Sequence, residues 1–166
     1  DTGGFMHGDI DSSEFRELLV RWFEYSTFCP ILRMHGDRFS SKHVPDGTRY
    51  FAPNELWSYG EDVYEILKKY VELREKLKGY IKEKFDEASE SGAPLIRAMF
   101  YEYPEDAECW KLNDQYMFGD KYLVAPVLEA GATERELYLP CGKWKNIRTN
   151  EIITGDEFLK ILCSGE

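Results

Sequence analysis

The chain has 166 residues, which is enough for one ordinary domain or two small ones. Hydrophobic residues make up 43% of it, which permits a buried core, and the formal net charge is −10. This acidic balance argues against nucleic-acid binding, because contacts to phosphates need clustered lysine and arginine. The sequence also contains no apolar run long enough to cross a membrane. We therefore expect neither a nucleic acid nor a membrane as a partner.

The four cysteines, Cys29, Cys109, Cys141 and Cys163, are widely and irregularly spaced. No Cys-x-x-Cys pair occurs, so a zinc site is not expected, and a disulfide framework would be unusual at this size. The simplest interpretation is free thiols in a reducing cytoplasm. Aromatic residues make up 15% of the chain, which is typical of a bulky core, although exposed rings also suit the faces of sugars.

The first five residues, Asp-Thr-Gly-Gly-Phe, are typical of the end of a strand and the turn after it. A carboxylate, two glycines and an aromatic ring at a strand end are common parts of an active-site rim. A natural chain rarely begins inside such a segment, so we expect a piece of a larger enzyme. An amphipathic helix follows, capped at Asp11 with Glu14 three residues later, and ends near Phe28.

Residues 29–36 predict a short buried strand. Because alternate side chains of a strand share a face, Arg33 and His35 are expected to point the same way. Residues 37–59 predict a polar loop whose length is typical of functional lids or mobile segments. The residues that stand out in this loop are Arg38, His43, Arg49 and Trp57.

A second, longer helix is predicted from about Glu61 to Ser91 by an apolar stripe at helical spacing. Gly79 lies inside it, where a helix can bend, and Gly92 and Pro94 mark its end. Strand end, helix, strand, loop and helix together form the pattern of parallel β/α units. Two such units cannot close a barrel or cover both faces of a sheet, which again indicates a piece of a larger fold.

After Pro94 the pattern changes to short strands separated by turns that contain glycine. The segments that predict strands are 95–101, 123–128, 134–139, 143–148, 151–154 and 158–162. Such a succession is typical of an antiparallel sheet or sandwich. We therefore expect an α/β part over residues 1–93 and an all-β part over residues 94–166.

Two expected strand ends carry side chains suited to chemistry. Asp1 and Phe5 lie at the first of them, and Arg33 and His35 lie at the next. In an α/β barrel successive strand ends lie side by side at one rim, where the chemistry takes place. A histidine there can hydrogen-bond sugar hydroxyls with either ring nitrogen. A lone histidine is more often structural, but two neighbouring strand ends of this kind favour a functional site.

The motifs and their order resemble the C-terminal part of a family-31 glycoside hydrolase, the family of retaining α-glucosidases and α-xylosidases. The matching segments are Asp-x-Gly-Gly-Phe (1–5), Arg21-Trp22, Phe28 with Pro30, Arg-x-His (33–35), residues 91–94 with Arg97, residues 102–106, 115–119 and 123–127, and residues 138–140 with Gly142 and Trp144. The resemblance covers roughly residues 1–144, and so many motifs in the right order make it specific.

For the fold, the resemblance implies the last strands and helices of a (β/α)8 barrel over residues 1–93. Residues 94–166 would then begin an antiparallel β-sandwich. For the parent protein it implies hydrolysis of terminal α-linked glucose or xylose from an oligosaccharide substrate, without a metal or an organic cofactor. The family cleaves with an aspartate nucleophile and an aspartate acid/base, and both lie upstream of the Asp-x-Gly-Gly-Phe motif. We therefore expect no catalytic residue in this chain and no activity from the chain alone.

The resemblance also implies roles for four residues. Asp1 would close strand seven of the barrel, and Phe5 would line the pocket of the sugar whose bond is cleaved. His35, at the end of strand eight, would hydrogen-bond hydroxyls of that sugar, and Arg33 would orient His35 or neighbouring carboxylates. Other conspicuous residues are expected to pack, to cap helices and turns, or to lie in loops without a clear role: Trp22, Arg97, Pro126, Asp9, Asp11, Asp106, His7 and His43.

Two alternatives remain open at this point. The chain could be a non-catalytic sugar-binding or scaffold remnant, which its aromatic content and His35 would allow. It could also be one subunit of a split enzyme, pairing with the missing N-terminal part or with itself through an apolar, open barrel edge. The sequence does not choose between glucose and xylose, because that choice depends on pocket residues at several strand ends.

Overall fold

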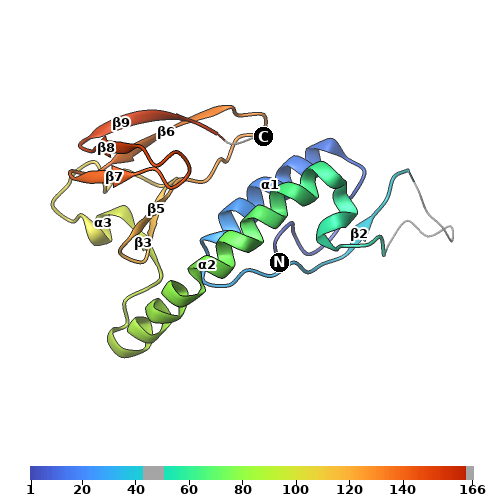
Figure 1. Cartoon of the computed structure of the whole chain (residues 1–166), viewed down its shortest axis with the longest axis horizontal. Helices are drawn as coiled ribbons and strands as arrows, with labels where there is room; N and C mark the ends of the chain where they lie inside the picture. The colour runs from blue at the N-terminus through green and yellow to red at the C-terminus, as the bar shows by residue number, and fades with distance from the viewer. Residues whose placement is uncertain (43–50, 164–166) are drawn as a thin grey trace. The chain divides into compact units, whose positions relative to one another are not determined.

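A computed structural model describes residues 1–42 and 51–163 (Figure 1). Residues 43–50 of the expected loop, with His43 and Arg49, and the last three residues lie outside these ranges. The chain divides into two compact units, residues 1–95 and residues 96–166, and each is described by itself. None of the described helices is both long enough and apolar enough to span a bilayer.

The first unit consists of short parallel strand pairs and two helices. Its elements are β1 (Gly8–Asp9), α1 (Ser13–Thr27), β2 (Arg38–Phe39), the 3-10 helix η1 (Leu56–Tyr59) and α2 (Glu61–Ser91). Strand β1 pairs in parallel with β2, and Thr2 forms a separate parallel bridge with Met34. The unit therefore has the β/α character that the sequence predicts.

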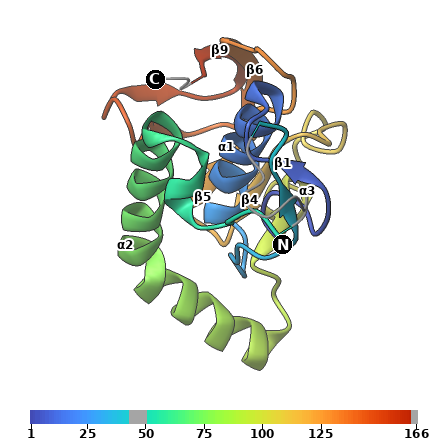
Figure 2. The ribbon, with the colours of Figure 1, turned by 90° about the vertical axis from the view of Figure 1, so that its right-hand side faces the viewer.

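Helices α1 and α2 lie side by side and run in the same direction (Figure 2). Two contacts follow the same order along both helices, Glu24 with Tyr70 and then Thr27 with Arg74, and Phe15 near the start of α1 meets Tyr59 of η1, just before α2. Between the helices lies a core of fully or nearly fully buried side chains, made of Leu19, Phe23, Tyr59, Val63 and Leu67. Parallel neighbouring helices joined through a strand are what a right-handed β/α connection produces.

The start of α1 differs from the prediction. Its cap is Ser12, which has extended backbone angles and accepts the N–H of Phe15 at 3.2 Å. The Ser12 hydroxyl in turn donates to Glu14 at 2.7 Å. Asp11 is engaged elsewhere: it accepts the hydroxyl of Ser40 and the N–H of Lys42. These partners lie about thirty residues downstream. Local spacing therefore could not reveal that the Asp11 carboxylate is hydrogen-bonded to them and does not cap the helix.

Helix α2 has the bounds that the sequence predicts, Glu61–Ser91. Gly92 ends it in a left-handed conformation, with φ at 78°, and donates its N–H to Ala88. A side chain is strained at such a φ, and glycine is therefore the usual residue after the last helical turn.

The expected strand over residues 29–36 is reduced to the single bridge at Met34. A ladder needs a partner alongside, and the partner segment turns away at Gly3 and Gly4, both with positive φ. The alternation of faces is nevertheless present, since Arg33 and His35 are exposed while Met34 packs against the core. The expected loop also differs from the prediction, because it contains β2, η1 and the fully buried Arg38.

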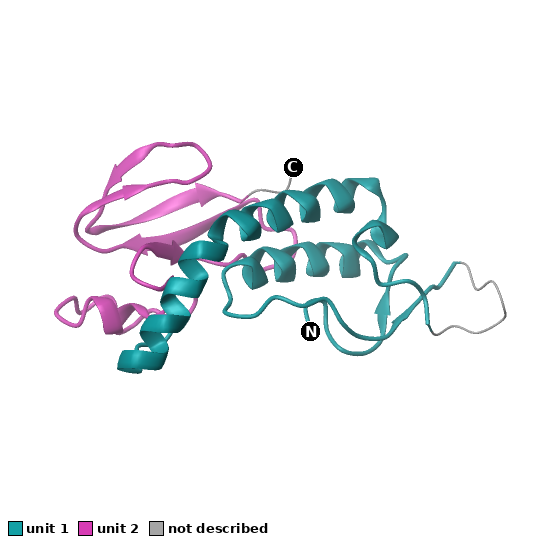
Figure 3. Cartoon of the chain, turned by 60° about the horizontal axis from the view of Figure 1, so that its bottom comes forward, with its two compact units in different colours: residues 1–95 teal, residues 96–166 magenta. Residues whose placement is uncertain are grey.

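The second unit is built from small antiparallel sheets (Figure 3). Its elements are β3 (Ile96–Ala98), α3 (Met99–Glu102), β4 (Tyr116–Phe118), β5 (Tyr122–Val124), β6 (Glu134–Leu139), β7 (Lys143–Lys145), β8 (Ile152–Thr154) and β9 (Glu157–Leu162). Strands β3, β4 and β5 form one sheet in that order, β6 pairs with β9, and β7 pairs with β8.

Strand β6 has the predicted bounds, whereas the first predicted strand of this unit is too long. It ends at Ala98, because Met99 is fully buried as the first residue of α3. The ion pair between Arg97 and Glu102, at 2.5 Å, closes this helical turn. Strand β4 is an addition to the prediction. The core of the unit comprises Met99, Cys109, Met117 and Tyr138, and all four cysteines of the chain are free thiols, as expected.

Candidate functional site

The two expected strand ends lie side by side in the first unit. Thr2 donates its N–H to Arg33 at 2.8 Å, and Asp37 donates its N–H to Phe5 at 2.7 Å. The hydroxyl of the buried Thr2 also donates to Ser26 of α1 at 2.9 Å. These backbone bonds hold residues 1–5 and 33–38 together, and we call the two segments the strand-end edge.

Asp1 and Arg33 form an ion pair at the strand-end edge. Two nitrogens of Arg33 donate to one carboxylate oxygen of Asp1, Nη2 at 2.7 Å and Nε at 3.3 Å. The Arg33 side chain is 63% exposed, and an ion pair so open to water contributes at most about 1 kcal/mol to stability. The pair therefore sets the direction of two side chains more than it stabilises the unit.

Phe5 and His35 form a ring pair on the same edge. Their ring centroids are 5.6 Å apart with the planes tilted by 36°. Phe5 is 57% exposed, and His35 is also exposed. The edge thus presents an apolar ring face directly beside an imidazole, which can both donate and accept hydrogen bonds. The four residues singled out in the sequence meet as two adjacent pairs.

Glycine is needed where the two segments approach each other. At Gly36, φ is +127°, and a Cβ there would lie 2.6 Å from the carbonyl oxygens of both Gly4 and Phe5. At Gly3, φ is +86°, and a Cβ would lie 2.7 Å from Leu19 and 2.9 Å from Arg38. A side chain at Gly36 would push the two segments apart, so this glycine sets the spacing at which Phe5 and His35 meet, whereas one at Gly3 would displace the ends of the Leu19 and Arg38 side chains.

The sequence marks Arg38 as conspicuous but suggests no role for it in the site, although Arg38 connects the parts of the site. The side chain is fully buried, and its guanidinium lies over the Phe15 ring, 5.3 Å from the centroid. Its Nη1 donates to the carbonyl oxygens of Gly4 and Asp37, each at 3.0 Å, and its Nε donates to the hydroxyl of Tyr59 at 2.9 Å. Its position directly after Gly36-Asp37, in a polar loop, was the only feature of the sequence that pointed to a role for Arg38.

Other residues noted in the sequence have structural roles. Asp9 accepts the N–H groups of Asp11 and Ser41, and Asp106 accepts that of Glu108, so both carboxylates hold turns as expected. Asp106 also accepts the hydroxyl of Tyr138 at 2.8 Å. Burial and this carboxylate raise the pKa of Tyr138. Arg97 is buried in its ion pair, and Trp22 lies under Gly4.

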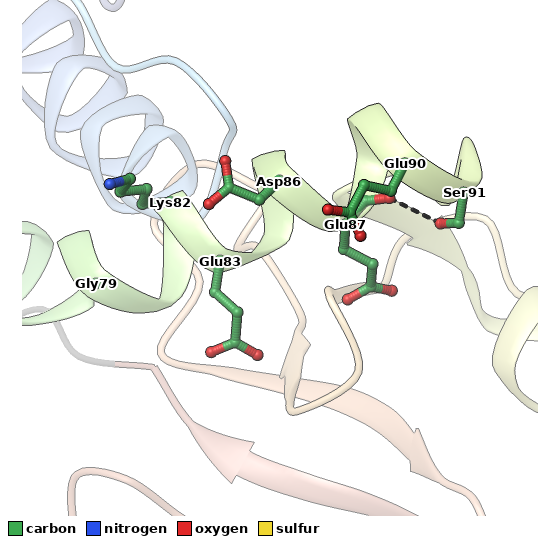
Figure 4. Close-up of a pocket in the computed structure, with 7 residues that line it drawn as sticks. All are labelled: Gly79, Lys82, Glu83, Asp86, Glu87, Glu90 and Ser91. Carbon is green, nitrogen blue, oxygen red and sulfur yellow. Dashed lines mark hydrogen bonds between the residues drawn. The ribbon is translucent and has the colours of Figure 1, made fainter.

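A hollow along α2 lies apart from the strand-end edge in sequence and carries mostly carboxylates (Figure 4). It is lined by Gly79, Lys82, Glu83, Asp86, Glu87, Glu90 and Ser91. Single-helix acidic faces are ordinary solvated surfaces. Within residues 1–42 and 51–163, no group of three or more histidine, cysteine, aspartate or glutamate side chains is arranged to hold a metal ion.

Parallel β/α units with aromatic and ionisable side chains at the strand ends define part of a barrel-type protein. Residues 1–83 match the family description "Glycosyl hydrolases family 31 TIM-barrel domain", and residues 92–163 match "Glycosyl hydrolase family 31 C-terminal domain". The chain belongs to glycoside hydrolase family 31. The sequence-based recognition and fold class are confirmed: the end of the family's barrel is followed by its β-rich C-terminal domain.

Individual relatives agree with this assignment. An α-xylosidase of Saccharolobus solfataricus is 33% identical over 97% of this chain and 20% of its own length. An α-glucosidase of the same organism is 37% identical over 96% of this chain and 22% of its own length. A crystal structure of a family-31 α-xylosidase from a soil metagenome, complexed with xylose, has a TM-score of 0.89 and 43% identity, covering 98% of this chain and 25% of that one. The chain spans about a fifth of the length of the curated relatives it matches.

Proposed function

We propose that the strand-end edge is part of the sugar-binding rim of a retaining α-glycosidase, which removes terminal α-linked glucose or xylose from oligosaccharides. The observation that carries this proposal is the ring pair of Phe5 and His35. Their ring centroids are 5.6 Å apart, and both side chains are open to solvent. An exposed ring offers a face to the C–H groups of a pyranose, and the imidazole beside it offers a donor and an acceptor to the hydroxyls.

In this proposal Asp1 and Arg33 flank the ring pair. Their ion pair, at 2.7 Å, keeps a carboxylate and a guanidinium at a fixed position on the same edge. Both groups retain hydrogen-bonding capacity toward a ligand, because one carboxylate oxygen binds two of the guanidinium nitrogens. Asp1 and Arg33 would therefore orient hydroxyls that the rings leave unbound.

The relatives support the class of substrate. The chain is similar to proteins called α-xylosidase and α-glucosidase, and the solved α-xylosidase carries xylose. Both sugars are pyranoses whose hydroxyls suit an imidazole and whose C–H faces suit an aromatic ring. The residues of the strand-end edge fit either, so the proposal names the two sugars together.

We also propose that the 166-residue chain alone does not hydrolyse glycosides. Cleavage with retention needs two carboxyl groups about 5–5.5 Å apart. Within the described residues, the strand-end edge has two carboxylates, and each has a structural partner: Asp1 pairs with Arg33, and Asp37 accepts the N–H of Phe51 at 3.4 Å. Turnover of an aryl α-glucoside or α-xyloside by the purified chain, with contaminating hydrolase excluded, would contradict this part of the proposal.

For the domains, we propose that the barrel part ends at residue 93 and that the sandwich begins at residue 94. The end of α2 at Ser91 and the left-handed Gly92 support this boundary. The division into units at residues 95 and 96 lies within two residues of it.

A titration of the isotope-labelled chain with xylose and with glucose, followed by NMR, tests the sugar site. We expect weak binding, with shift changes concentrated at Phe5, His35 and their neighbours. His35→Asn should remove these changes. His7→Asn is the matched control, because His7 is an exposed histidine of the same unit whose positive φ of 66° suits asparagine. Equal shift changes in both variants would contradict the proposal.

A further inference from the structure

Arg38 is a charged side chain without exposed surface. Burying a guanidinium costs several kcal/mol unless its N–H groups are hydrogen-bonded. Nε and Nη1 of Arg38 have partners from three places in the chain: the carbonyl of Gly4, the carbonyl of Asp37 and the hydroxyl of Tyr59. Its Nη2 has no hydrogen-bond partner among the described residues. One side chain thus joins both segments of the strand-end edge to η1.

The hydroxyl of Tyr59 extends this connection. It accepts from Arg38 and donates to the side-chain oxygen of Asn54. The amide of Asn54 in turn donates to the carbonyl of Gly36 at 3.1 Å. The bonds form a continuous chain that runs from Gly4 through Arg38, Tyr59 and Asn54 to Gly36. Its two ends are the residues directly before Phe5 and directly after His35.

We propose that Arg38 is a positioning residue, which fixes the distance between Phe5 and His35 by binding the carbonyl of Gly4 directly and that of Gly36 through Tyr59 and Asn54. The inference rests on the proposed function, in which these two rings contact the sugar. Arg38 does not reach the exposed face of the edge, so it acts only through the residues that it holds. The direct bond from Asp37 to Phe5 fixes one point of contact, and the chain of hydrogen bonds through Arg38 fixes the rotation about it.

A purely space-filling role for Arg38 makes a different prediction. The guanidinium also covers Phe15, and its Nη2 end lies against Gly3. If filling were its whole role, removing a hydrogen-bond partner while keeping the volume would leave the ring pair unchanged. The positioning role requires the opposite result.

Tyr59→Phe in the full chain separates the two roles, because it removes one hydroxyl and keeps the ring. Its matched control is Tyr70→Phe, which removes the hydroxyl that donates to Glu24 at 2.8 Å in the same unit. The signature is the nuclear Overhauser contact between the Phe5 and His35 rings, together with the ring-current shift of the His35 protons. We expect both to be lost in Tyr59→Phe and kept in Tyr70→Phe. A folded Tyr59→Phe that keeps both would overturn the proposal.

A measurement on the unsubstituted chain covers the case in which Tyr59→Phe does not fold. The Nε–H of Arg38 donates to Tyr59 inside the unit, whereas Arg33 is largely exposed. We expect the Arg38 Nε–H to exchange with solvent much more slowly than that of Arg33, and equal rates would overturn the proposal. These readouts need no sugar. A ring pair that depends on Tyr59, in a chain that shows no shift changes with xylose or glucose, would reject the proposed function and keep the positioning role.

Discussion

Replacing Arg74 by methionine should weaken the connection between α1 and the segment that carries His35. Arg74, on α2, donates to the carbonyl oxygens of Thr27 and Cys29 through Nη1 and to that of Pro30 through Nη2, at 2.5–2.8 Å. The first of these carbonyls belongs to the last turn of α1, where carbonyl groups lack partners within the helix. Methionine keeps the apolar stem of the side chain and removes the three donors.

The expected loss of stability follows from the number of these hydrogen bonds and from how far they are buried. A hydrogen bond to a charged group contributes roughly 1.5–3 kcal/mol, and an ordinary one roughly 1 kcal/mol. All three bonds are only partly buried. In the variant, water can therefore hydrogen-bond to some of the carbonyl groups that Arg74 leaves free. We therefore expect a loss of about 2–3 kcal/mol in the local free energy of opening around residues 27–35.

Hydrogen exchange measured by mass spectrometry or NMR reports this loss directly. A loss of about 2–3 kcal/mol corresponds to roughly 30- to 140-fold faster exchange at the amides that open with this segment. The amides to follow are those of Phe28 and Cys29, which donate to Tyr25 and Ser26. Lys78→Met is the control, because Lys78 is 77% exposed on the same helix and pairs only with Glu75 at 3.4 Å among the described contacts. Similar exchange in Arg74→Met and Lys78→Met would refute the reasoning.

Further predictions concern a glycine and a buried thiol. Gly36→Ala should separate the two segments and abolish the Phe5–His35 contact, because its Cβ would meet two carbonyl oxygens at 2.6 Å. Gly142→Ala has a similar positive φ, +140° against +127°, but open space around its Cβ, so NMR spectra showing equal damage from both would exclude the steric explanation. Burial and the nearby Asp106 raise the pKa of Cys109 from 9.0 to about 12. Folding therefore favours the protonated thiol, and its contribution should be complete below pH 9 and decline as pH rises toward 12. Urea unfolding should show a steeper loss of stability above pH 9 in the unsubstituted chain than in Cys109→Ala, and parallel curves would contradict this. At pH 8 iodoacetamide should modify the exposed Cys141 well before Cys109, and peptide mass spectrometry would detect the reverse order.

Much of the first unit follows from local rules. The bounds of α2 were predictable because an apolar stripe, acidic residues in the first turn and a glycine after the last one all coincide. The meeting of the Asp1 and Phe5 segment with the Arg33 and His35 segment followed from the rule that parallel strands end at a common edge. Both predictions depend on residues close in sequence or on a general property of the fold.

The errors have a common physical cause in long-range partners. Arg38 bonds to residues 21 and 34 positions away, and no local pattern distinguishes such an arginine from a solvated one. The same holds for Asp11, whose carboxylate is engaged by Ser40 across 29 positions, leaving the cap to Ser12. In the second unit the predicted strand ending at Tyr101 stops early because Met99 is drawn into the core as a helical turn begins.

The most direct measurement of the central claim is a crystal structure of this chain soaked with xylose or glucose at high concentration. We predict a pyranose ring packed against Phe5, with a hydroxyl within hydrogen-bonding distance of His35 and the Asp1–Arg33 pair alongside. A sugar bound only elsewhere, for example against the carboxylates of α2, would contradict the claim. So would an unoccupied strand-end edge in crystals where that edge is open to solvent.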